Sequence, residues 1–85
     1  MSYRVQFEPV ALKFLRKLRD EKLRERIIRE IETLQNEPRP SGSTKLSGLP
    51  YHRIRVGDHR VIYRIQDDVL LVLIVEIGHR REIYR

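Results

Sequence analysis

Two short polar turns between three strand-like segments constrain the fold of this chain more than any other feature. Segments 51–56, 59–66 and 69–77 are rich in valine, isoleucine and tyrosine, and in the first two segments apolar and charged side chains alternate. Gly57-Asp58 fits a two-residue type II′ turn, and Asp67-Asp68 is the second predicted turn. The sequence therefore predicts a three-stranded antiparallel meander.

A strand and two helices precede this meander. Residues 3–7 alternate apolar and polar side chains, and Pro9 suits the first turn of a helix whose apolar residues continue at helical spacing. The next helix carries one apolar stripe, formed by Leu23, Ile27, Ile31 and Leu34. A loop rich in proline, glycine and serine follows over residues 36–48. This order predicts an α+β fold, with an N-terminal strand and a helical hairpin packed on a mainly antiparallel four-stranded sheet.

The length of 85 residues is that of one small domain, so we expect residues 1–85 to form a single unit. The chain has no cysteine, which excludes internal disulfides and thiolate metal ligands. No segment near Met1 resembles a signal peptide, and the longest apolar run, residues 69–75, is far shorter than the ~20 residues of a membrane helix. We expect a cytoplasmic protein with no membrane contact and no cofactor.

The charge of the chain favours anionic partners. Eighteen basic and twelve acidic residues give a net charge of +6. Every basic residue after Lys45 is an arginine, whose planar, permanently charged fork suits phosphate better than a lysine does. An arginine-rich codon usage explains this bias equally well, so the charge alone indicates only that nucleic acid is a plausible partner.

The arginines of the first predicted hairpin fall on one face. A two-residue turn sets Arg55 directly opposite Arg60, and like charges so placed destabilise a sheet by ~0.2–1 kcal/mol. Alternation places four arginines on the face away from the apolar side chains: Arg53, Arg55, Arg60 and Arg64. Either these side chains extend into solvent or are neutralised by Asp58 or Glu82, or they form a pocket for an anion.

The second predicted hairpin brings the C-terminal residues to the same place. A tight turn at Asp67-Asp68 sets Arg60 opposite Val75 and His59 opposite Glu76, so the last strand ends beside Gly57-Asp58. Five side chains then gather at one end of the sheet: Arg53, Arg55, Arg60, Arg80 and Tyr84. Four guanidinium groups and a phenol ring form a candidate site for an RNA phosphate with its base.

Three runs of residues carry a resemblance to a known family. They are Lys45-Leu46-x-Gly48-Leu49, then Tyr51 to Tyr63, then Gly78 to Tyr84. In their order and spacing they resemble the RelE toxins of the RelE/ParE superfamily. The resemblance implies a type II toxin, a ribosome-dependent, metal-independent mRNA endoribonuclease that acts in the decoding site. It also implies a cognate antitoxin as partner and contact with operator DNA only through the antitoxin complex.

The resemblance also implies roles for individual residues. The catalytic set is Arg55, Arg60, Arg80 and Tyr84, and the RNA-binding set is Arg53, Arg81 and Lys45. Arg60 matches the arginine that stabilises the scissile phosphate, whereas Arg55 stands where the family often has lysine. An arginine, with a pKa above ~12, is a poor general base. Which group removes the proton from the attacking 2′-hydroxyl is therefore open.

Histidines offer a second constellation. His59 opposite Glu76 makes either an acid–base pair or, as the usual excess of structural contacts favours, a structural contact at the sheet rim. His79 adjoins Arg80 and is the better candidate acid or base. A metal site built from His52, His59 and His79 is disfavoured, because their spacing and strand faces scatter them.

Other functions remain open at this level. One is a ParE-like DNA gyrase poison with the same fold, and another is a non-catalytic nucleic-acid-binding module. Aliphatic residues on both faces of the last strand fit a fully buried central strand, which strand propensity favours. Alternatively, Leu71, Leu73 and Val75 help to form a groove for an antitoxin helix.

Overall fold

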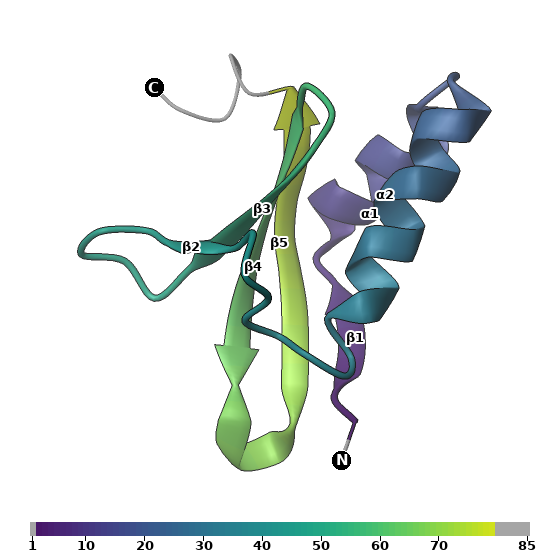
Figure 1. Ribbon diagram of the computed structural model, residues 1–85. Helices are drawn as coiled ribbons and strands as arrows, with labels where there is room; N and C mark the ends of the chain where they lie inside the picture. The colour runs from purple at the N-terminus through teal and green to yellow at the C-terminus, as the bar shows by residue number, and fades with distance from the viewer. Residues whose placement is uncertain (1, 80–85) are drawn as a thin grey trace.

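The structure, a computed structural model, describes residues 2–79. In chain order these residues form β1 (Arg4–Phe7), α1 (Pro9–Lys17), α2 (Glu21–Thr33), β2 (Thr44–Lys45), β3 (His52–Val56), β4 (His59–Gln66), a 3-10 turn (Asp67–Val69) and β5 (Leu71–His79). Figure 1 shows both helices on one side of the strands, whereas the loop that contains β2 projects to the other side. No helix within residues 2–79 has the length and apolar character needed to cross a membrane.

The predicted α+β fold is confirmed, with one more strand than expected. Within the described residues the sheet order is β1-β5-β4-β3-β2, and β1 runs parallel to β5 while the other neighbours are antiparallel. The predicted four strands become five because Thr44 pairs with Arg53 and Lys45 with His52. A strand of two residues inside a loop is too short to show alternation, so the sequence pattern does not reveal it.

The helices begin where local chemistry places them. Pro9 occupies the start of α1, where its missing N–H costs no hydrogen bond, and Arg16 and Lys17 lie in the last turn near the negative end of the helix dipole. Asp20 caps α2, since its side chain accepts a hydrogen bond of 3.1 Å from the backbone N–H of Leu23.

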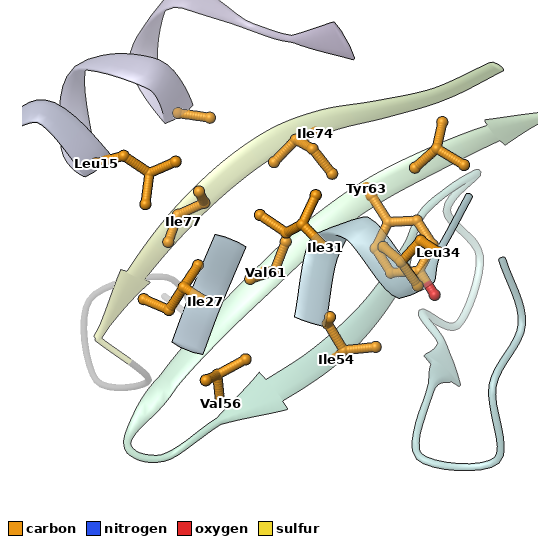
Figure 2. Packing of buried hydrophobic residues seen from close by; sticks show 12 residues of the cluster. Leu15, Ile27, Ile31, Leu34, Ile54, Val56, Val61, Tyr63, Ile74 and Ile77 are labelled. Atoms are coloured by element: carbon orange, nitrogen blue, oxygen red, sulfur yellow. The ribbon is translucent and has the colours of Figure 1, made fainter. Parts of the chain in front are cut away.

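The core lies between the helices and one face of the sheet. Buried side chains of the helices pack against those of the strands (Figure 2), and the largest of them are Tyr63, Ile27, Ile31, Leu34, Ile74, Val56, Val61 and Val72. On β3 and β4 these are the alternate residues that the sequence predicts to face inward. Burial of each such aliphatic side chain contributes about 1.5–3 kcal/mol.

The turn between β3 and β4 has the predicted form, but the turn between β4 and β5 does not. Gly57 has a φ of 60° and joins two strands in which Val56 pairs with His59. The prediction of a two-residue turn at Asp67-Asp68 is wrong, because a 3-10 turn and Leu70, with a left-handed φ of 51°, separate the strands. The last strand therefore begins at Leu71 rather than at residue 69.

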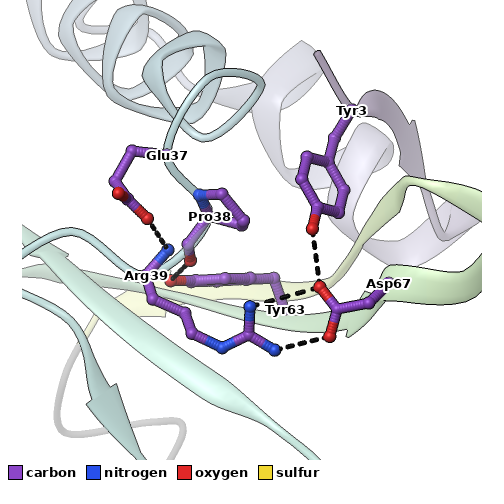
Figure 3. Close-up of polar contacts among 6 residues, drawn as sticks. All are labelled: Tyr3, Glu37, Pro38, Arg39, Tyr63 and Asp67. Carbon is purple, nitrogen blue, oxygen red and sulfur yellow. Dashed lines mark hydrogen bonds and ion pairs between the residues drawn. The ribbon is translucent and has the colours of Figure 1, made fainter. Parts of the chain in front are cut away.

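A cluster of polar side chains fastens this longer turn to the rest of the molecule (Figure 3). Arg39 donates hydrogen bonds of 3.2 and 2.7 Å to the two carboxylate oxygens of Asp67, and the hydroxyl of Tyr3 donates one of 2.6 Å to the same carboxylate. These bonds lower the pKa of Asp67 from 3.8 to about 2, Arg39 having the larger effect. Nearby, the buried hydroxyl of Tyr63 donates a hydrogen bond of 2.8 Å to the carbonyl of Pro38. Sequence reasoning did not find this cluster.

Candidate nucleic-acid interface

The four arginines predicted to share a face do so. Arg53 and Arg55 project from β3, and Arg60 and Arg64 from β4, opposite in direction to the core residues between them. We call the side of the sheet that bears them the arginine face. Arg55 and Arg64 are exposed, whereas Arg53 and Arg60 are half-buried. Both helices pack on the other side of the sheet, and they reach this face only at its margins, Val10 of α1 near Arg64 and Glu30 of α2 near Arg55.

Arg55 lies directly opposite Arg60, as predicted. The pair concentrates positive charge where two strands meet, at a cost of ~0.2–1 kcal/mol. Arg53, one step along the same face, donates a hydrogen bond of 3.3 Å from Nη2 to the Oγ1 of Thr44 on β2. The short strand β2 thus holds one of the arginines in place at the edge of the site.

The partners of Arg60 and His59 on β5 differ from those predicted. Arg60 lies opposite Gly78 rather than Val75, and His59 lies opposite His79 rather than Glu76. Two causes combine: the longer turn before β5, and a bulge at Ile62 and Tyr63 that shifts the register by one further residue.

This register changes what surrounds Arg60. Gly78, which is itself buried, places no side chain of β5 beside Arg60 on the arginine face. Two residues earlier, Glu76 lies opposite Ile62 and therefore projects from the arginine face. It is the only acidic residue within β3, β4 and β5, and it is exposed. A carboxylate thus stands among the guanidinium groups, which the sequence analysis did not foresee.

The histidines lie on the helix side of the sheet. The rings of His59 and His79 meet edge to face with centroids 5.6 Å apart, and Phe14 of α1 lies 5.7 Å from His59. His79 is therefore not brought to the arginine face, although it precedes Arg80. Among residues 2–79 no group of three histidine, cysteine or acidic side chains is arranged to hold a metal ion.

His52 and Lys45 also lie away from the arginine face. They are opposite each other in the β2–β3 pair, and the ring of His52 stacks on that of Tyr63 with centroids 5.8 Å apart. Burial lowers the pKa of His52, and the charges of Arg39 and Lys45 lower it further, which favours the neutral imidazole. The ammonium group of Lys45 donates a hydrogen bond of 2.7 Å to the carbonyl of Leu49.

β5 ends at His79, opposite the first residue of β4. The predicted site residues Arg80, Arg81 and Tyr84, and the possible neutralising residue Glu82, lie outside the described residues.

Comparison with known proteins places this arrangement in a family. The family described as "ParE toxin of type II toxin-antitoxin system, parDE" matches residues 5–84. The chain belongs to the RelE/ParE superfamily of type II toxins. None of the curated proteins compared with the chain matches it.

Solved structures of this superfamily share the whole fold. The chain is 28% identical to one from the archaeal RelE–RelB complex of Pyrococcus horikoshii OT3, which covers 96% of this chain and 99% of its own, with a TM-score of 0.82. The isolated E. coli RelE toxin is also 28% identical, and the match covers 98% of this chain and 92% of that toxin, with a TM-score of 0.81. A chain of the RelBE2 complex of Mycobacterium tuberculosis is 25% identical, and the match covers 94% of this chain and 100% of that one, with a TM-score of 0.79.

Proposed function

We propose that this toxin is a ribosome-dependent mRNA endoribonuclease that inhibits translation. The observation that carries the proposal is the pairing of Arg55 with Arg60 across β3 and β4, where the only β5 residue opposite Arg60 is Gly78. Two guanidinium groups that stand opposite each other repel, whereas a pentacoordinate phosphate bound between them is stabilised by both. The likeness to RelE chains over nearly the whole length supports the same function.

The proposed reaction is attack by a 2′-hydroxyl on the adjacent phosphorus. A bond forms between the 2′-oxygen and phosphorus, the bond from phosphorus to the 5′-oxygen breaks, and a 2′,3′-cyclic phosphate and a 5′-hydroxyl result. Arg60 and Arg80 neutralise the charge that develops on the phosphate, while Arg53 and Arg55 hold the flanking phosphates. Tyr84 stacks on a base or orients the 2′-hydroxyl.

Glu76 supplies the proton acceptor that the arginines lack. A carboxylate accepts a proton, whereas a guanidinium group does not, and Glu76 is the only acidic side chain that the three central strands place on this face. His79, whose ring contacts His59 on the opposite face, is not assigned this step. The proton for the leaving 5′-oxygen comes from Arg80 or from solvent.

The partners follow from the family. Structures related to this chain were solved as complexes of RelE with RelB from Pyrococcus horikoshii OT3 and E. coli. We propose that this toxin likewise binds a cognate antitoxin in the cytoplasm, that it meets operator DNA only in that complex, and that its target is the ribosome with mRNA in the decoding site.

A second candidate is a DNA gyrase poison, which the match to the ParE family favours. That activity gives no reason for a carboxylate and paired arginines on one sheet face. The two candidates separate in one pair of assays: translation of a defined mRNA with mapping of the RNA ends, and supercoiling by gyrase. Cuts within ribosome-occupied codons support the nuclease, and inhibited supercoiling or cleaved DNA complexes with intact mRNA contradict it.

A further inference from the structure

A hollow of about 330 Å³ lies where the arginine face meets the start of α1. Its walls are Glu8, Val10, Tyr51, Arg64, Leu73 and Val75. Arg64 and Leu73 are directly paired in the β4–β5 ladder and both project from the arginine face. None of these residues belongs to the proposed catalytic set.

The hollow lies along β4 from the proposed catalytic centre. Arg60 and Arg64 are four residues apart on the same face, which at 3.3 Å per residue is roughly 13 Å. A single strand of RNA covers this distance within a few nucleotides. Between the two arginines on this face lies Ile62, a residue that is only 5% exposed.

The chemistry of the walls fits a nucleotide. Tyr51 offers an aromatic ring, and the side chains of Leu73 and Val75 are half-buried aliphatic surfaces against which a base can pack. Arg64 is exposed at the same place and offers a fork for a phosphate. An aromatic and aliphatic wall beside an arginine is the combination by which proteins bind unpaired bases.

Glu8 adds a basis for selectivity among bases. It precedes α1 in the position of the N-cap, but its side chain makes no capping hydrogen bond, so the carboxylate is available to the hollow that it lines. A carboxylate accepts hydrogen bonds from the exocyclic amino groups of cytosine, adenine or guanine, whereas uracil has no such group.

We propose that this hollow is a nucleotide-binding subsite for single-stranded RNA, which holds a base bearing an exocyclic amino group at a short distance along the strand from the scissile phosphate. The position assigned to this subsite, relative to the scissile phosphate, rests on the proposed nuclease function. The exposed guanidinium group of Arg64 and the position of the hollow on the arginine face favour RNA as the occupant over an apolar side chain of a partner protein.

The test measures binding without cleavage. Short fluorescent oligonucleotides with 2′-O-methyl groups at every position cannot react, and fluorescence anisotropy at several salt concentrations gives their affinity for the purified chain. We expect Tyr51→Leu to weaken binding about tenfold, and Tyr51→Phe, which retains the ring, to restore it. Thermal unfolding verifies that each variant is folded.

A charge variant provides an independent test with a matched control. Arg64→Gln alters an exposed side chain, and we expect it to weaken binding. We also expect the plot of the logarithm of the binding constant against the logarithm of the salt concentration to become less steep by about 1. Arg29→Gln alters an exposed arginine on α2 and should leave both quantities unchanged. We further expect oligocytidylate to bind more tightly than oligouridylate, and Glu8→Gln to reduce this difference.

The outcomes separate the subsite from the proposed function. Loss of affinity in Tyr51→Leu and Arg64→Gln supports the subsite even if the unaltered chain cuts no mRNA on ribosomes, a result that would overturn the nuclease alone. Unchanged affinity in both folded variants overturns the subsite, whatever the cleavage activity. Weaker antitoxin binding with unchanged RNA binding also overturns it, because the hollow would then serve a protein partner.

Discussion

Glu76 on β5 and Arg60 on β4 project from the same face of the sheet. The bulge at Ile62 and Tyr63 brings this about, because one extra residue in β5 reverses the faces of the residues that follow it. Before the bulge, Val72 and Ile74 point into the core, and after it Ile77 does. Without the bulge Glu76 would lie on the core face.

The first prediction concerns this carboxylate. Glu76→Gln keeps the size of the side chain but removes the proton acceptor, so we expect cleavage on ribosomes to fall about 10²–10⁴-fold with little change in the apparent affinity for the ribosome. Since Glu76 is exposed, the free energy of unfolding should change by less than about 0.5 kcal/mol. Glu25→Gln, on the exposed surface of α2, is the control. Full activity in Glu76→Gln would remove the proposed base.

The second prediction separates the arginine pair from the fold. Arg60→Ala should lower cleavage by ~10²-fold or more, because one stabiliser of the phosphate charge is lost. Stability should hold or rise slightly, since the repulsion between Arg55 and Arg60 is relieved. Single-turnover cleavage and chemical denaturation measure the two effects. Arg16→Ala on α1 should change neither, and unfolding of Arg60→Ala would show that this arginine holds the sheet together.

The third prediction concerns acid stability. The pKa of Asp67 is lowered from 3.8 to about 2 in the folded protein, chiefly by Arg39 and then by Tyr3. Its stabilising effect is therefore complete above about pH 4 and is lost as the pH falls towards 2. In Asp67→Asn, thermal unfolding followed between pH 2 and 4 should show a shallower pH dependence than the unaltered chain does. Asp68→Asn, in the same turn, leaves the hydrogen bonds of Arg39 and Tyr3 to Asp67 in place and is the control.

The fourth prediction tests the bond between Tyr63 and Pro38. Tyr63→Phe removes a buried hydroxyl and leaves the carbonyl of Pro38 without its donor. We expect unfolding free energy to fall by about 1–3 kcal/mol, measured by urea denaturation. Cleavage should be unaffected, because Tyr63 points into the core and not towards the arginine face. A variant as stable as the unaltered chain would show that this bond contributes nothing net.

Local patterns sufficed for part of the fold. Gly57 fixes a two-residue turn, and the turn fixes every pair in the β3–β4 ladder, including Arg55 with Arg60. The helices follow from Pro9, Asp20 and their apolar stripes. These features depend on residues close together in the sequence, where propensity and alternation carry the information.

Other parts depend on residues far apart. Asp67-Asp68 is a weak turn signal, and the register of β5 was decided by Leu70 and by a bulge that leaves no mark in the alternation of apolar residues. The bonds of Asp67 to Tyr3 and Arg39 span 64 and 28 positions, and no periodicity reports such contacts. For the same reason, the place of Glu76 among the arginines could not be predicted.

The most direct test of the central claim is to translate a defined mRNA in a purified system with this protein, and to map the RNA ends. A matched sample contains the same mRNA without ribosomes. We predict cuts within ribosome-occupied codons that leave 2′,3′-cyclic phosphates, and slow or absent cleavage of the free RNA, because the ribosome supplies part of the positioning. Fast cleavage of free RNA would contradict the claim that the ribosome helps to position the RNA. Intact mRNA on translating ribosomes would contradict the proposed nuclease activity.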